Sequence, residues 1–423
     1  MVRTLLWMVG VVFYRNKLYY IKLVARNIIN PVSWIVANLI PKQKNLILLT
    51  GSTHSRYNES SRYLYEYILL NYSSLQPIWM TDSKTVYAFL LEKKMPVAYH
   101  RSIKGAFCYL RAGVVIGTGS IYPKLYEFVG KKTIKICLWH GVGPRSTNAV
   151  DNEVNDNPLV KSALHNLKKL HLFDVFNFTS EFTATTIGKL QFMIPKNKRF
   201  ILGYPRCDHL MQKEKMDSRL DEKKFFSSIF PKINLKSKTI LYSPTWRAND
   251  RKQSLPVNLL SGFNLIKFDQ WLTENNLYLL ISVHPLVEHE ACIRDCHRIK
   301  YISDDPLLDI NQVLPEIDLL LTDYSSIATD FILLDRPVIY IMPDYDFFLL
   351  EYGMIEDMRL SLPGYEVKSA DELESKILDS IVNPSEKSSN RTKYLERYYD
   401  TSNINSCEKC CEIIKMKIDK GFK

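Results

Sequence analysis

From about residue 45 onward, short apolar runs alternate with longer stretches whose apolar residues recur at helical spacing. One series of runs ends near Gly203, and a second begins after a charged, Lys-rich stretch, Lys213–Lys238. Short continuous apolar runs between helical stretches predict parallel strands that are covered on both faces. Two such series predict an α/β protein with two doubly wound, Rossmann-like domains. The predicted strands are Leu46–Thr50, Pro77–Met80, Val114–Gly117, Ile134–Trp139, Val175–Ser180, Phe200–Gly203, Thr239–Ser243, Leu277–His284, Ile299–Ser303, Ile317–Thr322 and Pro337–Met342.

The first 42 residues follow a different pattern, in which aromatic and apolar residues are interleaved with cations. The apolar run 4–13 is shorter than the roughly 20 residues that a helix needs to cross a bilayer, and no signal-type cleavage site follows it. Such a segment is typical of one that lies in the headgroup layer of an anionic membrane. The alternative is that its helices pack on the core of the first domain. The predicted organisation is an amphipathic membrane-associating segment (1–42), a first domain (43–210), a second domain (211–400) and a C-terminal basic helix (401–423).

The formal charge of +11 and the pI near 9.0 favour an anionic partner, such as nucleic acid, an acidic membrane or a phosphorylated substrate. No Asp or Glu precedes Glu59, so the cations gather beside the apolar N-terminal runs, and no base-stacking platform for nucleic acid is evident. Eight cysteines without a regular framework are typical of a cytosolic chain with reduced thiols. Only Cys407, Cys410 and Cys411 have metal-like spacing. A zinc site needs four ligands, so no metal site is predicted.

Polar residues at predicted strand ends are candidates for a site, because ligands bind outside the carboxyl ends of open α/β sheets. The strand that ends at Trp139 is followed directly by His140, two glycines, a proline and Arg145. A histidine there can take a proton from an attacking hydroxyl at neutral pH. Arg145 can hold a phosphate through two N–H groups. The alternative for His140 is a loop histidine bonded to the backbone.

Two further motifs carry arginines. A Gly-Tyr-Pro-Arg-Cys-Asp motif follows the last strand of the first series, and its Arg206 and Asp208 would either fix a linker or face the cleft. A Tyr-Ser-Pro-Thr-Trp-Arg motif ends the first strand of the second series. There Thr245 offers a hydroxyl and Arg247 a fixed cation, which suits a phosphate or pyrophosphate. A structural salt bridge is the alternative for Arg247.

The remaining strand-end candidates lie in the second series. His284 either donates to a phosphate oxygen or is satisfied locally. The Thr322–Ser326 turn leads into an apolar helix, which Asp323 or Ser325 would cap. The first N–H groups of that helix, with the hydroxyls of Ser325 and Ser326, predict a cradle for a diphosphate. Capping alone is the alternative, and the two roles are compatible.

No Walker-type loop and no dinucleotide-type glycine fingerprint accompanies these motifs. The prediction therefore depends on their combination: His140 and the Thr322–Ser326 turn should face each other across a gap sized for a nucleotide diphosphate.

At these positions the chain resembles the CDP-glycerol glycerophosphotransferase family, the teichoic-acid primase and polymerase type, which also includes capsule polymer synthases. That family shows W-H-G-T-P followed by basic residues, then G-x-P-R-x-D, Y-x-P-T-W-R, R-x-H-P, T-D-Y-S-S and D-R-P. The resemblance covers roughly residues 45–390, in the right order. The departures are Val142-Gly143-Pro144 for Thr-Pro, Arg145 for a common Lys, Ser282 for an Arg and Cys207 for a frequent Asn. The matching residues are Trp139-His140-Gly141, Gly203, Pro205-Arg206, Asp208, Pro244-Thr245-Trp246-Arg247, His284-Pro285, Thr322-Asp323-Tyr324-Ser325-Ser326 and Asp335-Arg336-Pro337.

The resemblance implies a GT-B architecture, in which two Rossmann-like domains face a cleft and the second domain holds most of the donor. It implies that the first domain receives the acceptor and that His140, with His284, is catalytic. Gly141 and Asp208 would be acceptor-side or structural. The residues that would hold the donor phosphates are Arg145, Arg206, Thr245, Arg247, Asp323, Ser325 and Ser326.

The implied reaction moves glycerol phosphate or ribitol phosphate from a CDP-activated donor to the terminal hydroxyl of a lipid-linked, capsular or teichoic-acid-like polymer, and releases CMP. The expected partners are the CDP-polyol, the acceptor and an anionic membrane surface, without nucleic acid. No cofactor is firmly implied, although Mg²⁺ can accompany the donor. The expected location is peripheral, on the cytoplasmic face of the bacterial membrane. The alternative is a GT-B glycosyltransferase or sugar-phosphate transferase that uses another nucleotide-sugar donor.

Overall fold

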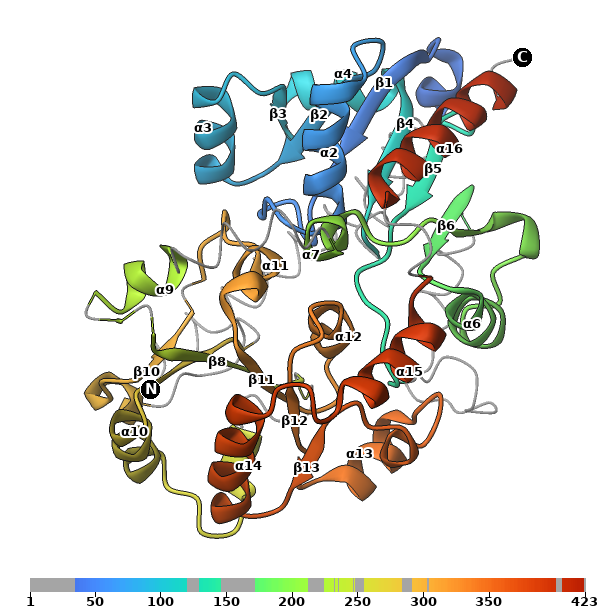
Figure 1. Ribbon diagram of the computed structural model, residues 1–423. Helices are drawn as coiled ribbons and strands as arrows, with labels where there is room; N and C mark the ends of the chain where they lie inside the picture. The colour runs from blue at the N-terminus through green and yellow to red at the C-terminus, as the bar shows by residue number, and fades with distance from the viewer. Residues whose placement is uncertain are drawn as a thin grey trace, which may run out of the picture.

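The computed structural model shows two lobes, each built on a parallel sheet flanked by helices (Figure 1). The two sheets fall inside the predicted domain ranges 43–210 and 211–400, whose limits stay predictions. Residues 1–34, most of the predicted membrane-associating segment, lie outside the described residues. The structure describes residues 35–119, 129–145, 172–211, 224–231, 233–234, 236–245, 247, 255–283, 291–302, 304–400 and 405–421.

The first sheet has seven parallel strands in the order β3-β2-β1-β4-β5-β6-β7. Alternate residues of β1 enter two different apolar clusters, Leu48 on one face and Ile47 and Leu49 on the other. The sheet is thus covered on both faces, which explains the continuous apolar runs. Its strands are β1 (Gln43–Leu49), β2 (Gln76–Thr81), β3 (Val97–Tyr99), β4 (Ala112–Gly117), β5 (Ile134–Cys137), β6 (Val175–Phe178) and β7 (Arg199–Ile201).

The second sheet has six parallel strands in the order β10-β9-β8-β11-β12-β13. The strand order reverses between β8 and β11, where Thr322 pairs with Ser243. Chain segments that leave these two strands therefore start side by side at the ligand edge of the sheet. The strands are β8 (Lys238–Ser243), β9 (Leu277–Ile281), β10 (Ile299–Tyr301), β11 (Leu319–Thr322), β12 (Val338–Ile341) and β13 (Tyr365–Val367).

All eleven predicted runs coincide with strands, and the predicted two-domain α/β fold is confirmed. Two strands, β3 and β13, were not predicted. Both lie at sheet edges, where β3 is bounded by Pro96 and His100 and β13 is interrupted by Glu366, so neither forms a long apolar run. The run ending at His284 was too long, because β9 ends at Ile281.

Helices connect the strands, and several begin with a side-chain cap. Ser83, Ser102 and Ser369 accept a hydrogen bond from the first-turn backbone of α3, α4 and α14. The helices are α2 (Glu59–Asn71), α3 (Lys84–Glu92), α4 (Ile103–Arg111), α6 (Glu181–Thr183), the π-helix η2 (Ala184–Gln191), α7 (Asp208–Met211), α9 (Lys224–Ile229), α10 (Leu265–Glu274), α11 (Ile310–Val313), α12 (Ile327–Ile332), α13 (Tyr345–Tyr352), α14 (Ala370–Val382), α15 (Ser388–Tyr398) and α16 (Ser406–Gly421), with 3₁₀ turns η3 (Lys196–Lys198), η4 (Pro205–Cys207), η5 (Pro256–Leu259), η6 (Ala291–Asp295), η7 (Leu314–Glu316) and η8 (Met358–Leu360).

The C-terminal helix α16 returns to the first lobe, where it lies against α2 and β5 (Figure 1). Its Cys410, Cys411 and Ile414 are buried in the apolar cluster of the first sheet. The cysteines thus serve as core residues. Among the described residues, no three His, Cys, Asp or Glu side chains are grouped so as to hold a metal ion.

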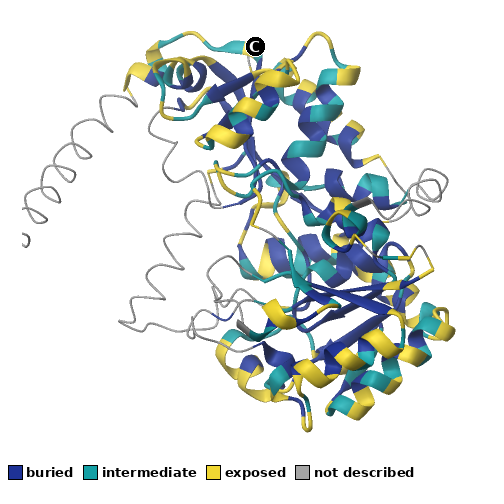
Figure 2. Ribbon diagram, turned by 90° about the vertical axis from the view of Figure 1, so that its left-hand side faces the viewer, coloured by how far each residue is buried: buried dark blue, intermediate teal, exposed yellow. Residues whose placement is uncertain are grey.

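Burial follows the layers, with dark blue sheets inside and exposed residues on the outer helix faces (Figure 2). In the part of the chain that the structure covers, no helix has the length and apolar character needed to cross a bilayer.

Candidate active site between the two domains

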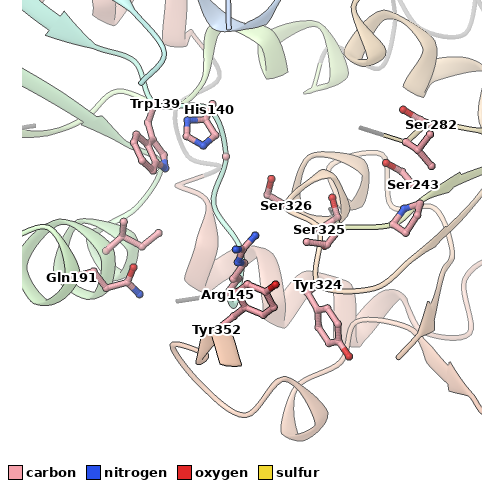
Figure 3. Close-up of a pocket in the computed structure, with 16 residues that line it drawn as sticks. Trp139, His140, Arg145, Gln191, Ser243, Ser282, Tyr324, Ser325, Ser326 and Tyr352 are labelled. Atoms are coloured by element: carbon pink, nitrogen blue, oxygen red, sulfur yellow. The ribbon is translucent and has the colours of Figure 1, made fainter. Parts of the chain in front are cut away.

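A cavity of about 580 Å³ lies between the lobes, within the usual size of a small-molecule site. His140 points into it from the first domain, and Ser325 and Ser326 approach from the second (Figure 3). The predicted juxtaposition of His140 with the Thr322–Ser326 turn is therefore present. The lining residues are Trp139, His140, Gly141, Gly143, Arg145, Ile187 and Gln191 from the first domain, and Ser243, Pro244, Thr245, Ser282, Val283, Tyr324, Ser325, Ser326 and Tyr352 from the second.

His140 follows β5, and a backbone contact fixes the orientation of its ring. Its Nδ1 lies 2.9 Å from the carbonyl oxygen of Thr118, which follows β4. A carbonyl oxygen only accepts hydrogen bonds, so Nδ1 carries a proton. In the neutral ring the lone pair then belongs to Nε2, which makes Nε2 the basic atom. The backbone-bonded alternative and the proton-acceptor role are thus compatible.

The pKa of His140 is lowered, chiefly because the surrounding walls remove water from the imidazole. The hydrogen bond to Thr118 acts in the opposite direction, and the positive charge of Arg206 adds to the lowering. The side chain itself is exposed to the cavity, so the desolvation comes from the cleft rather than from close contacts. A lowered pKa keeps His140 neutral, and able to accept a proton, near pH 7.

Trp139 holds the imidazole from one side. Its backbone has a positive φ of 59°, an unfavourable conformation for a non-glycine residue. The indole packs on the ring of His140, with centroids 4.2 Å apart, and on Phe192 at 4.9 Å. Phe192 directly follows the π-helix η2, and π-helical turns are rare and frequent at functional sites. Trp139, in its strained conformation, thus connects His140 to the end of the π-helix η2, two residues of which line the cavity.

The glycines after His140 let the loop reach the second domain. A Cβ atom at Gly141 would overlap Ser326 Oγ and lie 2.9 Å from Ser326 Cβ. The same atom at Gly143 would lie 3.4 Å from Ser326 Cα, an ordinary contact. Gly141 is therefore required by close approach of the two domains, whereas Gly143 is not.

We expect Gly141→Ala to lower kcat/KM about tenfold or more, because the methyl group pushes Ser326 away from His140 and small misplacements of reacting groups are costly. Gly143→Ala is the matched control in the same loop and should retain near-normal activity. Steady-state kinetics of both variants, with thermal melts to check folding, tests the difference. Equal activities would show that the contact with Ser326 does not matter.

Arg145 lies on the second-domain side of the cavity although it belongs to the first domain. It forms an isolated bridge with Met354, and the neighbouring Pro144 carbonyl accepts from the N–H of Ile355 at 2.7 Å. Its guanidinium lies over the ring of Tyr352 at 4.9 Å. This position, at the cavity and exposed, suits a phosphate ligand.

Asp323 and Arg247 are buried behind the cavity wall instead of lining it. Arg247 donates to Asp323 at 2.8 Å and to both carboxylate oxygens of Asp344 at 2.7 and 3.0 Å. Asp323 also accepts the backbone N–H of Thr245 at 2.7 Å and that of Tyr324 at 2.6 Å. For Arg247 the structure shows the salt bridge that was the alternative. The pair fixes the two strand ends that carry the cavity residues.

The Ser325–Ser326 turn differs from the predicted cap. Neither Asp323 nor Ser325 caps α12: Ser326 occupies the N-cap position, without a side-chain cap bond. Helix α12 has only six residues, too few for a strong helix dipole. Its contribution is therefore local, through the serine hydroxyls and first N–H groups. Thr245 also lines the cavity, and its buried Oγ1 has no hydrogen-bond partner in the described part of the chain.

Arg206 and Asp208 do not pair with each other and do not line the cavity. Arg206 is 2% exposed and donates to Asp330 and Glu59. Asp208 accepts the N–H groups of Ser406 and Cys407, which caps helix α16. Arg206 was expected to hold a donor phosphate but lies outside the cavity lining. Asp208 was expected to be either acceptor-side or structural, and its contacts with helix α16 are structural.

His284 lies outside the described residues, so its role stays a prediction, whereas Ser282 of the same strand end lines the cavity. Three lining residues were not anticipated: Ile187 and Gln191 on η2, and Tyr352 on α13. Their sequence gives no distinguishing signal, since each lies on a helix of ordinary composition.

Two Rossmann-like domains that face a shared cavity, with a histidine on one wall and serine hydroxyls on the other, are the arrangement of the GT-B class. A family model described as CDP-glycerol:poly(glycerophosphate) glycerophosphotransferase matches residues 32–416, and the chain belongs to this family. The suspected resemblance is confirmed, and the alternative of another nucleotide-sugar donor is not favoured.

Individual relatives agree with this family. The chain is 25% identical over 386 residues to the teichoic acid glycerol-phosphate transferase of Staphylococcus aureus (strain NCTC 8325 / PS 47), covering 88% of this chain and 93% of that protein. It is 26% identical over 356 residues to the teichoic acid poly(glycerol phosphate) polymerase of Bacillus spizizenii (strain ATCC 23059 / NRRL B-14472 / W23), covering 82% and 85%. The solved wall teichoic acid polymerase TagF has the same fold, with a TM-score of 0.75, 19% identity and coverage of 97% and 98%.

Proposed function

We propose that this protein transfers glycerol phosphate or ribitol phosphate from a CDP-activated donor to the terminal hydroxyl of a teichoic-acid-like or capsular polymer, with release of CMP. The observation that carries the proposal is the cavity shared by His140 and the Ser325–Ser326 turn. Two relatives named above are a glycerol-phosphate transferase and a poly(glycerol phosphate) polymerase, and another is a teichoic acid ribitol-phosphate primase. TagF has also been solved after a soak with CDPG.

In the proposed reaction, the acceptor hydroxyl attacks the β-phosphorus of the donor while its proton passes to Nε2 of His140. A new P–O bond forms, the bond to the CMP oxygen breaks, and CMP carries away the electron pair. Ser325, Ser326 and Thr245 donate hydrogen bonds to the phosphate oxygens, and Arg145 neutralises charge as it shifts to CMP. His284 is a further proposed donor. Asp323 and Arg247 act indirectly, because they hold Thr245 and Tyr324 in place.

The test is to incubate the purified protein and a polymer acceptor with CDP-glycerol, CDP-ribitol or UDP-sugars, and to measure CMP and UDP. We expect CMP release that requires a CDP-polyol and the acceptor together. Release of UDP from a UDP-sugar, with no CMP from either CDP-polyol, would overturn the proposal.

We also propose that the protein works at the surface of an anionic membrane, on its cytoplasmic side, through the segment 1–42. In the described end of that segment, Ile35 and Leu39 are 53% and 77% exposed. On helix α4, Ile103 and Phe107 are 80% and 59% exposed beside the cation of Lys104. Exposed apolar side chains among cations are typical of a surface that inserts into headgroups. Unchanged flotation with anionic vesicles after removal of residues 1–42 would contradict the role of the segment.

A further inference from the structure

One face of helix α12 meets the first domain at two points. Ser326, at its start, contacts the loop after His140 so closely that Gly141 has no room for a Cβ atom. Asp330 lies four residues later and therefore on the same face, one turn along the helix. Its carboxylate accepts a hydrogen bond at 2.8 Å from Nε of Arg206, at the end of the first domain. The segment that carries the serine hydroxyls is thus held at both ends of one turn.

The second contact is part of a buried ionic cluster. Arg206 is 2% exposed and donates its NH1 group to Glu59 of helix α2 at 2.9 Å. The ring of Tyr204 lies 4.4 Å below the guanidinium, and the thiol of Cys207 lies 3.4 Å from the other oxygen of Asp330. Two donor atoms of Arg206, Nε and one terminal nitrogen, thus bind carboxylates of the protein, and Arg206 is not among the residues that line the cavity.

Glu59 is also attached to the second domain through its backbone. Its N–H donates to Asp309 at 2.9 Å, and Asp309 in turn caps helix α11 through the N–H of Asn311. Glu59 has a positive φ of 66°, which a non-glycine residue adopts only when its surroundings impose it. Strain of this kind, at a residue bonded to both domains, is expected where a defined domain spacing has to be maintained.

We infer that Glu59, Arg206 and Asp330 form an interdomain clamp that holds the Ser325–Ser326 turn at a fixed distance from His140. Arg206 is thus a positioning residue and not a phosphate ligand. The clamp joins helix α2, the end of the first domain and helix α12, three elements that are far apart in the chain. Its catalytic consequence rests on the proposed function, but the domain spacing that it sets is measurable without any substrate.

The protonation of Glu59 gives the clamp a pH dependence. Burial raises the pKa of Glu59 to about 7; the charge of Arg206 opposes this rise, and the charges of Asp309 and Asp330 add to it. A carboxyl group in a more open cleft has an ordinary pKa near 4.3. The closed form therefore binds the proton more tightly, so closure is favoured below about pH 7 and weakens as the pH rises through 7.

Two variants separate the clamp from general packing. Asp330→Asn removes a charge that Arg206 requires, and should open the cleft at every pH. Glu59→Gln keeps an oxygen for Arg206 and mimics the protonated acid, so the cleft should stay closed at pH 8. Glu366→Gln is the control, because it removes a carboxylate from an ion pair with Arg359, 2.8 Å long, that lies within the second domain. Arg206 itself is a poor target, because its loss leaves the buried carboxylate of Asp330 and the partly buried one of Glu59 without a cation and threatens folding.

The first readout is the interdomain distance by pulsed electron paramagnetic resonance, with spin labels at Leu70→Cys and Val382→Cys. These positions are 84% and 74% exposed, on helices of different domains. Cys292, the cysteine that is not fully buried, is replaced by Ser to avoid labelling. The second readout is kcat and KM for the CDP-polyol. We expect Asp330→Asn to lengthen the distance and lower kcat about 10- to 100-fold, as for misplaced reacting groups.

The wild type should show a longer or broader distance distribution at pH 8 than at pH 6, and Glu59→Gln should not. The control should follow the wild type. An Asp330→Asn variant with wild-type distances and wild-type kcat, in folded protein, would refute the clamp. So would a Glu59→Gln variant that keeps the wild-type pH response. Loss of CMP release in the wild type itself, with the distances behaving as expected, would instead count against the proposed function alone.

Discussion

Replacing His140 with alanine should lower the rate of CMP release about 10²–10⁴-fold, the usual range for loss of a general acid or base. The structure provides the reason: Nδ1 is occupied by the Thr118 carbonyl, so Nε2 is the atom that can take the acceptor's proton. His140→Asn is a sharper variant, because its side-chain amide nitrogen takes the place of Nδ1 and can keep the bond to Thr118, but the amide cannot accept a proton. Both variants should lose turnover alike, with unchanged circular dichroism and thermal melts.

The pH profile provides an independent check. Since His140 must be neutral to act, and its pKa is lowered, activity should persist below the ordinary histidine pKa of about 6.5 and fall only at more acidic pH. The acid limb of kcat/KM should disappear from the small residual activity of His140→Asn. Near-normal turnover in either variant would remove His140 from the mechanism.

The fold was predictable because the two sheets are buried on both faces. Strands such as β4 and β9 are nearly continuous apolar runs, and such runs can be recognised in the sequence alone. The edge strand β3 was missed because its apolar run is bounded by Pro96 and His100, and β13 because Glu366 interrupts it. The equally short edge strands β7 and β10 were found because their apolar runs continue to Leu202 and Ile302. The return of α16 to the first domain was not predictable either, because nothing in a helix's own sequence says which sheet its apolar face will cover.

The site residues that could be predicted are those whose place in the fold is determined by the end of a strand. His140, Ser325 and Ser326 lie at the cavity because the carboxyl ends of parallel strands meet there. Arg206 and Arg247 also follow strands, but their partners are Asp330 and Asp344, 124 and 97 residues later in the chain. A sequence motif cannot show that an arginine will pair with a carboxylate far away in the chain. A buried structural arginine and a phosphate-binding arginine therefore look the same in the sequence.

Loss of the ion pairs of Arg247 should have a second large effect, on the stability of the fold rather than on catalysis. Arg247→Met should lower the free energy of unfolding by about 3–5 kcal/mol, because it leaves the completely buried Asp323 without its cation. Arg247→Lys should recover only part of this loss, since an ammonium group cannot reach Asp323 and both oxygens of Asp344 with the same geometry. Urea unfolding followed by circular dichroism measures the difference.

Urea unfolding repeated at acidic pH distinguishes the ion pair between Arg247 and Asp344 from simple packing. Burial alone would raise the pKa of Asp344, but the hydrogen bonds and charge of Arg247, together with hydrogen bonds from Tyr324 and the backbone, outweigh burial and lower the pKa overall. The pairing therefore stabilises the fold above the ordinary carboxyl pKa, and this stability is lost as the pH falls through the acid range. Arg247→Met should lack that acid dependence. The control Arg359→Met breaks a half-exposed ion pair with Glu366, so it should lower the free energy of unfolding by less than about 1 kcal/mol and keep the acid dependence. If the two methionine variants unfold at the same urea concentration, Arg247 is not the support on which the strand ends of the second domain depend.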